Sequence, residues 1–217
     1  MNVPIKLLIA YEHVTRVDSK AFDVLVANKH DVRFRDRARI ALSQDIERSA
    51  ENRDEKRLPM LLNAVEQLET EGVDERKAEY SAQFYQALKE WNQYAAQAET
   101  YARSHLLPKL TAEAKLQDST TFWLTYTKLC SIGWYFFKNV KDEAKLKTMA
   151  DYVRQVNQLA ETPAAAGVCA CLLYQTGQKD LAVQLQEQAL LLAEQAGEAD
   201  KEAYKDRLKR MQKGKPL

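Results

Sequence analysis

The chain has 217 residues, with 32 Lys and Arg against 31 Asp and Glu, so its formal net charge of +1 provides no global positive field for nucleic acid. Only 6 glycines and 5 prolines are present, too few for the many tight turns of an all-β sandwich or barrel. Hydrophobic residues make up 46% and charged residues 29%, which excludes a membrane bundle and a disordered chain. We therefore expect a globular protein with no nucleic-acid partner and no membrane insertion.

The N-terminal part of the chain has the apolar spacing of amphipathic helices, with apolar residues every three or four positions. Asp18-Ser19 is expected to cap a helix, and a helix stop around Gly72 precedes a new helix start. We predict that residues 1–73 form an N-terminal helical segment. Its expected apolar stripes consist of Ile5, Leu8 and Ile9; Ala21, Phe22, Leu25 and Val26; Phe34, Ala38, Ala41, Leu42 and Ile46; and Leu61, Leu62, Val65 and Leu68.

A charged stretch within this segment interleaves arginines with acids. Mixed signs at helical spacing are typical of a solvated helix face with pairs four residues apart, and we predict no nucleic-acid binding there. The acid Glu69, further along, is also expected on the surface. The stretch comprises Arg33, Arg35, Arg37, Arg39, Asp31, Asp36, Asp45 and Glu47.

From residue 74 to residue 212 the pattern becomes a run of helices joined by short turns. Thr162-Pro163 opens one helix as cap and first-turn proline, Gly177 marks a turn, and the last long helix is expected over residues 180–198. Residues 213–217 are expected to fray. The predicted fold is all-α, with stacked antiparallel helical hairpins.

One of these hairpins has the spacing of a tetratricopeptide repeat. Small residues in the motif let two antiparallel helices approach closely, and a looser copy precedes it around Gly133. We expect about three such pairs, as in a right-handed α-solenoid, because a single repeat cannot bury its own apolar face. The motif consists of Ala166, Cys169, Ala170, Leu173, Gly177, Ala182, Gln186 and Ala189.

Residues 132–134, 137–142 and 172–177 resemble the C-terminal helical region of bacterial thioredoxin-like proteins, and residues 17–28 resemble the helix that follows the thioredoxin fold there. The redox motif of that family, C-x-x-C, is missing from this chain. The resemblance therefore implies the helical region without its thioredoxin domain. It implies a non-catalytic scaffold that binds a protein or peptide, possible partners including a thioredoxin-like domain, and it favours export to the periplasm over the cytoplasm.

In the repeat register, one face of each first helix lines a concave groove. An aromatic groove with a basic rim suits an extended peptide or a partner helix. The alternative is that the C-terminal helix or a neighbouring hairpin fills this groove as ordinary core. The predicted groove residues are Thr127, Cys130, Trp134, Phe137 and Lys138 on one hairpin, and Gly167, Cys171, Tyr174 and Gln175 on the next.

The three cysteines are best interpreted as small buried hydrophobes. Cys169 and Cys171 point about 200° apart on a helix and cannot bond to each other. Cys130 and Cys171 lie on adjacent predicted helices. A disulfide between these two is the basis of our alternative hypothesis, a thiol–disulfide redox-responsive accessory protein.

No sequence pattern predicts an enzyme. His13, His30 and His105 lack the spacing of metal ligands, and no phosphate loop, hydrolase elbow or zinc-protease motif occurs. We therefore expect no catalytic residue, no cofactor and no metal site. Self-association through the ends of the helical array is a third possibility.

Overall fold

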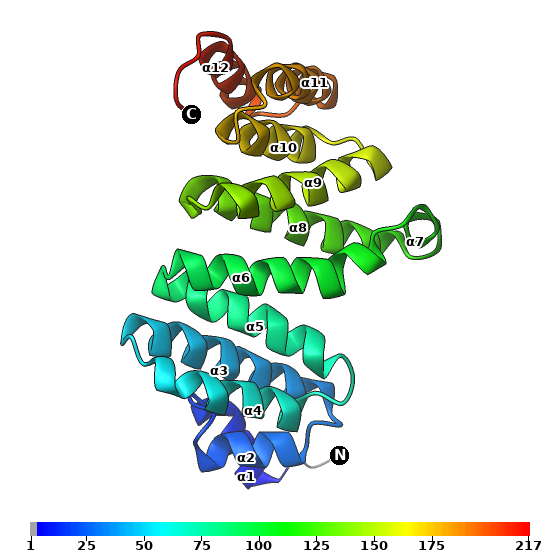
Figure 1. Ribbon diagram of the computed structural model, residues 1–217. Coiled ribbons are helices and arrows are strands. Elements are labelled where there is room, and N and C mark those ends of the chain that lie inside the picture. Colours follow the sequence, from blue (N-terminus) through cyan, green and yellow to red (C-terminus); the bar gives the residue numbers. More distant parts are fainter. Residues whose placement is uncertain (1–3) are drawn as a thin grey trace. The chain divides into compact units, whose positions relative to one another are not determined.

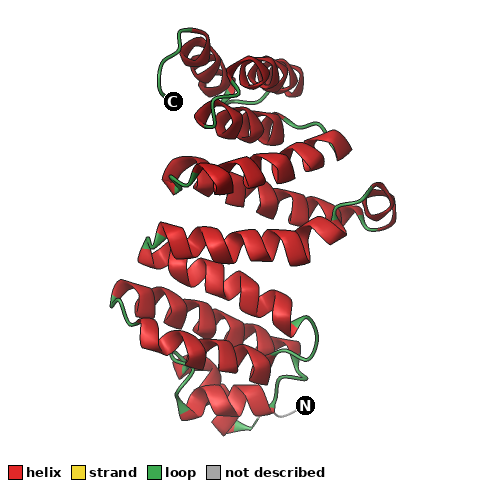
Figure 2. Ribbon diagram, in the orientation of Figure 1, coloured by secondary structure: helices red, strands yellow, loops and turns green. Residues whose placement is uncertain are grey.

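The computed structural model describes residues 4–217, and every regular element in that range is a helix (Figures 1 and 2). This confirms the prediction of an all-α protein. The α-helices of the described residues number twelve. Their bounds are α1 (Ile5–His13), α2 (Lys20–Ala27), α3 (Val32–Glu51), α4 (Leu58–Leu68), α5 (Val73–Leu88), α6 (Trp91–Tyr101), α7 (Ala112–Gln117), α8 (Ser119–Asn139), α9 (Glu143–Leu159), α10 (Pro163–Gln175), α11 (Lys179–Ala196) and α12 (Lys201–Gln212).

The chain divides into two compact units, Met1–Ala98 and Glu99–Leu217. The division falls within α6, whereas the sequence suggests a limit after residue 73, where α5 begins. Within residues 4–217, no helix is both long and apolar enough to cross a membrane.

Several helix ends lie where local sequence predicts them. The Ser19 hydroxyl accepts a hydrogen bond from the Phe22 amide at the start of α2, and Thr162 caps α10 in the same way, with Pro163 in its first turn. Gly177 closes the turn between α10 and α11 with a φ of +82°, a left-handed conformation that glycine adopts without strain.

The first unit has a core built from α2, α3, α4 and α5. The apolar stripes predicted for α2, α3 and α4 supply most of it, and Phe84 of α5 joins them. The stripe of α1 behaves differently, because Ile5, Leu8 and Ile9 remain exposed and Ala10 is the buried residue of that helix. Fully buried core side chains include Phe22, Leu25, Leu42, Leu61, Val65 and Phe84.

Asp45, predicted on a solvated face, is in fact buried, with 1% of its surface exposed. Its Oδ2 accepts hydrogen bonds from Arg57 Nη2 at 2.7 Å and from the Val17 amide at 3.0 Å. Arg57 also pairs with Asp18 at 3.1 Å. This network joins α3 to the segments before α2 and α4, and a buried carboxylate needs such partners.

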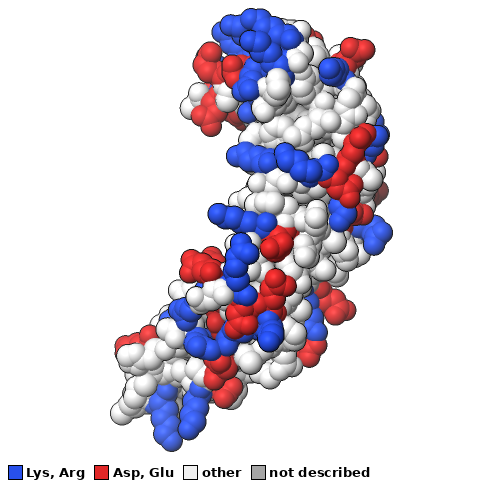
Figure 3. Space-filling model, turned by 60° about the vertical axis from the view of Figure 1, so that its left-hand side comes forward, with Lys and Arg blue, Asp and Glu red and all other residues white. Residues whose placement is uncertain are grey.

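Glu69 is a second acid whose predicted surface position is wrong, since only 7% of it is exposed. Arg39 of α3 donates from Nε to Glu69 Oε1 at 2.8 Å and from Nη2 to Oε2 at 2.5 Å, a two-pronged pair. Burial by itself raises the pKa of Glu69, but the hydrogen bonds and charge of Arg39 outweigh it and hold that pKa below its usual value. Elsewhere the face seen in Figure 3 intermixes Lys and Arg with Asp and Glu.

In the second unit α10 is the central helix, packed against α8, α9 and α11. Every residue from 165 to 174 is buried. Gly133 of α8 lies close to both α10 and α9, because a Cβ there would lie 2.8 Å from Val168 Cγ1 and 2.9 Å from Val153 Cγ2. Glycine is therefore required for three helices to meet at this point.

Two helices of this unit, α7 and α12, are not among the elements expected from the sequence. After α12 the chain turns back in the segment for which fraying is expected. The Lys215 amide donates to the Arg210 carbonyl at 2.9 Å, and the Lys215 carbonyl accepts from the Tyr174 hydroxyl at 3.0 Å.

We predict that Asp45→Ala lowers the free energy of unfolding by about 3 kcal/mol, because Arg57 then keeps a partly buried charge with the more exposed Asp18 as its remaining ion-pair partner among the described residues. Urea denaturation followed by circular dichroism measures this change. The control is Asp36→Ala, whose carboxylate is 56% exposed and pairs with Arg39 at 3.4 Å, and which should cost less than about 0.5 kcal/mol. Equal effects of the two substitutions would contradict the prediction.

Gly133→Ala should lower the free energy of unfolding by about 1–3 kcal/mol despite the better helix propensity of alanine, because the added methyl overlaps two stiff valines. The matched control is Ser131→Ala, an exposed position on the same helix, where little change is expected. A Gly133→Ala protein that is more stable than the wild type would show that α8, α9 and α10 are not packed this closely.

Candidate functional site

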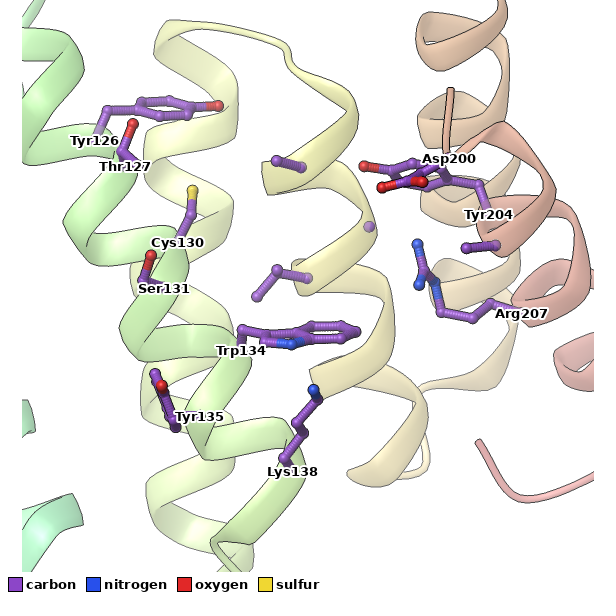
Figure 4. A pocket seen from close by; sticks show the side chains of 14 residues that line it. Tyr126, Thr127, Cys130, Ser131, Trp134, Tyr135, Lys138, Asp200, Tyr204 and Arg207 are labelled. Carbon is purple, nitrogen blue, oxygen red and sulfur yellow. The ribbon is translucent and has the colours of Figure 1, made fainter. Parts of the chain in front are cut away.

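The second unit contains a groove of about 550 Å³ between α8, α10 and α12, which we call the α8–α12 groove (Figure 4). Three segments form its walls and floor. The lining residues are Tyr126, Thr127, Cys130, Ser131, Trp134, Tyr135 and Lys138 of α8; Ala164, Gly167 and Val168 of α10; and Asp200, Ala203, Tyr204 and Arg207 at and within α12.

The α8 wall is set by helical spacing, because residues three and four positions apart share one face. Its upper end is anchored by Tyr126, whose hydroxyl donates to the Ala160 carbonyl at 2.6 Å and lies 2.8 Å from Thr162 Oγ1. Burial raises the pKa of Tyr126, so the hydroxyl stays protonated and remains a donor. This contact fixes the start of the wall against the α9–α10 turn.

The floor of the groove is hollow because α10 presents small residues there. Ala164 and Gly167 leave space that larger side chains would fill. The Tyr204 ring of α12 uses part of this space, and a Cβ at Gly167 would lie 2.9 Å from its Cε1 atom. Gly167 thus lets Tyr204 lie against the backbone of α10.

The α12 wall is held from behind by α11. Gln186 of α11 is fully buried and donates from Nε2 to the Tyr204 carbonyl at 2.9 Å. Burial and then the charge of Glu198 raise the pKa of Tyr204. The groove is therefore bounded on this side by a helix that the same unit supplies.

Trp134 crosses the groove from α8 toward α12 (Figure 4). Lys138 Nζ lies 4.8 Å from the centre of the Trp134 ring, and the Arg207 guanidinium lies 5.6 Å from it. The same guanidinium is 4.6 Å from the Tyr204 ring centre. One indole thus attracts two cations from different helices through cation–π interactions.

The groove brings together five of the residues that the repeat register predicts to face it. These are Thr127, Cys130, Trp134, Lys138 and Gly167. Half-exposed Trp134 and exposed Thr127 and Lys138 are accessible to a partner, whereas Cys130 is buried.

The structure places the other four predicted residues outside the groove lining. Phe137 is 9% exposed and packs beside Trp134 with ring centres 5.3 Å apart. Cys171 is fully buried. Tyr174 is covered by the C-terminal turn through its hydrogen bond to Lys215, and Gln175 donates from Nε2 to the Phe137 carbonyl at 2.9 Å.

The sequence analysis did not identify the α12 side of the groove. The signal was present but weak, since Tyr204, Leu208 and Met211 follow the i, i+4, i+7 spacing within a highly charged segment. In the structure α12 forms one wall of the groove, whereas the sequence-based alternative has the C-terminal helix or a neighbouring hairpin fill it as ordinary core.

All three cysteines are free and buried thiols. Burial raises the pKa of Cys130, Cys169 and Cys171 to about 12. After burial, the charge of the Cys169 thiol also raises the pKa of Cys130. The Cys169 Sγ lies 3.7 Å from the Ala150 carbonyl oxygen. The charges of Arg154 and Arg207 lower the pKa values of Cys169 and Cys171, but burial outweighs them. Thiols with raised pKa values are poor nucleophiles at neutral pH.

Among residues 4–217, no group of three or more His, Cys, Asp and Glu side chains is placed to hold a metal ion. No known protein family, curated protein or solved structure shows significant similarity to this chain.

We predict that the native protein reacts very slowly with a thiol reagent at pH 8, because a pKa of about 12 leaves about a thousandfold less thiolate than an ordinary value of 9. Labelling with iodoacetamide, followed by mass spectrometry, measures the rate, and the control is the same reaction in denaturant. Rapid labelling of native Cys130 and Cys171 would contradict the prediction and support the redox alternative.

Because the pKa values of the three cysteines are raised in the folded state, their contribution to the free energy of unfolding should be full below pH 9 and fall as the pH rises from 9 toward 12.

Proposed function

We propose that this chain is a non-catalytic protein–protein interaction module whose α8–α12 groove binds a peptide segment of a partner protein. The observation that carries the proposal is the open groove around Trp134. Its aromatic lining offers a large apolar contact area, and its exposed rim carries Lys138. Trp, Tyr and Arg side chains, here Trp134, Tyr204 and Arg207, are the types that dominate binding energy in protein interfaces.

The size of the groove favours a short segment over a whole domain. A volume of about 550 Å³ lies in the range of small-molecule binding sites. A few consecutive residues of a peptide are enough to fill it. Thr127 and Ser131 provide exposed hydroxyls along the α8 wall for contact with a peptide backbone. The proposed partner segment therefore lies along α8, with an apolar side chain against Trp134.

We also propose that the pairs α8–α9 and α10–α11 are tetratricopeptide-like hairpins of a right-handed array. The glycine turn after α10 and the small residues of α10 support this interpretation. The sequence resemblance supports a further proposal, that this helical region accompanies an exported thioredoxin-like domain. The partner segment then belongs to that domain or to a protein on which it acts.

The test is selection of a random displayed peptide library against the purified full chain. Peptides that bind the wild type should lose at least about tenfold in affinity for Trp134→Ala, because the central aromatic contact is gone. The matched control is Trp123→Ala, which removes a tryptophan that is 38% exposed on the same helix and does not line the groove. Circular dichroism and urea denaturation verify that both variants fold.

Two outcomes would contradict the proposed function. The first is a library from which no specific binder is recovered. The second is a set of peptides that bind wild type and Trp134→Ala equally, which would place their site elsewhere on the chain.

A further inference from the structure

We infer that the partner segment is acidic, with an Asp or Glu side chain bound between Lys138 and Arg207 at the edge of Trp134. This inference rests on the proposed function and names the chemistry of the ligand. Four features of the groove carry it. Two are that Lys138 and Arg207 have no ion-pair partner, and that one guanidinium donor has no acceptor, among the residues that the structure describes. The others are the charge of the C-terminal segment and the position of Asp200.

Lys138 and Arg207 face the same indole, and neither forms an ion pair with any residue in the part of the chain that the structure describes. The neighbouring cations of α12 differ, since Lys205 pairs with Glu202 at 3.8 Å and Arg210 with Asp206 at 3.9 Å. Two positive charges that share one aromatic ring repel each other, and a carboxylate between them would remove that repulsion.

Arg207 also carries a specific unmet hydrogen-bonding requirement. Its Nε atom is buried and has no hydrogen-bond acceptor among residues 4–217. A buried donor without a partner is costly, and a guanidinium matches the two oxygens of a carboxylate in a planar, two-pronged geometry. The inferred carboxylate would accept from this edge of Arg207 once the side chain turns Nε toward the groove, and it would face the Lys138 ammonium.

The C-terminal segment adds a positive field to this end of the unit. Residues 201–217 hold seven Lys and Arg and two acids, a formal net charge of +5. Figure 3 shows Lys and Arg side chains gathered at the C-terminal end of the molecule. Such a local excess, in a chain with a total net charge of only +1, raises the rate of encounter with an acidic partner.

Asp200 indicates where along the groove the acidic residue binds. Figure 4 shows it beside Tyr204, away from Lys138, so the groove has an acidic end and a basic end. A partner carboxylate near Asp200 would be repelled, whereas one near Lys138 would be attracted. The charges therefore orient the segment as well as attract it.

The experiment measures binding of two rhodamine-labelled peptides to the full chain by fluorescence anisotropy. Both are acetylated and amidated, so neither has a terminal charge; one alternates Glu with Leu and the other alternates Gln with Leu. We expect the Glu peptide to bind at least about tenfold more tightly, since charge-assisted hydrogen bonds exceed neutral ones. Added salt should weaken only the Glu peptide.

Three single substitutions locate the effect. Lys138→Gln and Arg207→Gln should each weaken the Glu peptide about fivefold or more and leave the Gln peptide unchanged. The matched control Lys205→Gln removes the same charge from α12 at a side chain that is 65% exposed and outside the groove, and it should have little effect. Inorganic phosphate and a single-stranded DNA oligomer are added as competitors, and neither is expected to displace the Glu peptide at physiological salt.

The inference is overturned by any of four results: no binding of the Glu peptide, equal binding of the two peptides, equal losses in Lys205→Gln and Arg207→Gln, or displacement by phosphate or DNA. Its failure is distinguishable from that of the proposed function. Uncharged library peptides that depend on Trp134 would leave the proposed function intact and exclude the acidic ligand.

Discussion

The close packing of α10 against three neighbouring helices is the constraint on which the second unit depends. Gly133 on α8 and the alanines of α10 remove the side-chain bulk that would otherwise keep these helices apart. The same small residues, Ala164 and Gly167, leave the floor of the α8–α12 groove hollow. One compositional feature therefore holds the helices together and creates the space in which we propose that a partner binds.

The polar helix α12 shows how a segment with little apolar surface becomes part of a site. It contributes one buried side chain, Met211, and its placement depends on the hydrogen bond from Gln186 and on the contact of Tyr204 with Gly167. These contacts bring Arg207 over Trp134, which lies 73 positions earlier in the chain. The basic end of the groove is therefore a product of packing between distant segments.

In the first unit, buried ion pairs connect the helices, whereas in the second unit small residues allow the helices to pack closely. Asp45 and Glu69 are buried, and each is neutralised by an arginine that reaches it from another segment. Removal of one partner leaves an uncompensated charge, so such pairs specify how the helices fit together even where their net contribution to stability is small. Some residues of the charged stretch of α3, such as Asp45, are therefore buried, and others, such as Asp36, are exposed to solvent.

Local sequence by itself determined the helices other than α7 and α12, several of their ends and the apolar faces of α2, α3 and α4, because capping and the 3.6-residue period act over a few neighbouring residues. It also placed Trp134 and Lys138 on one face of α8. Tertiary structure alone decided that Asp45 is buried, that α1 leaves Ile5, Leu8 and Ile9 exposed, and that Tyr174 is covered by the C-terminal turn. The reason is physical: periodicity shows which face of a helix is apolar, but whether that face is covered depends on segments far away in the sequence.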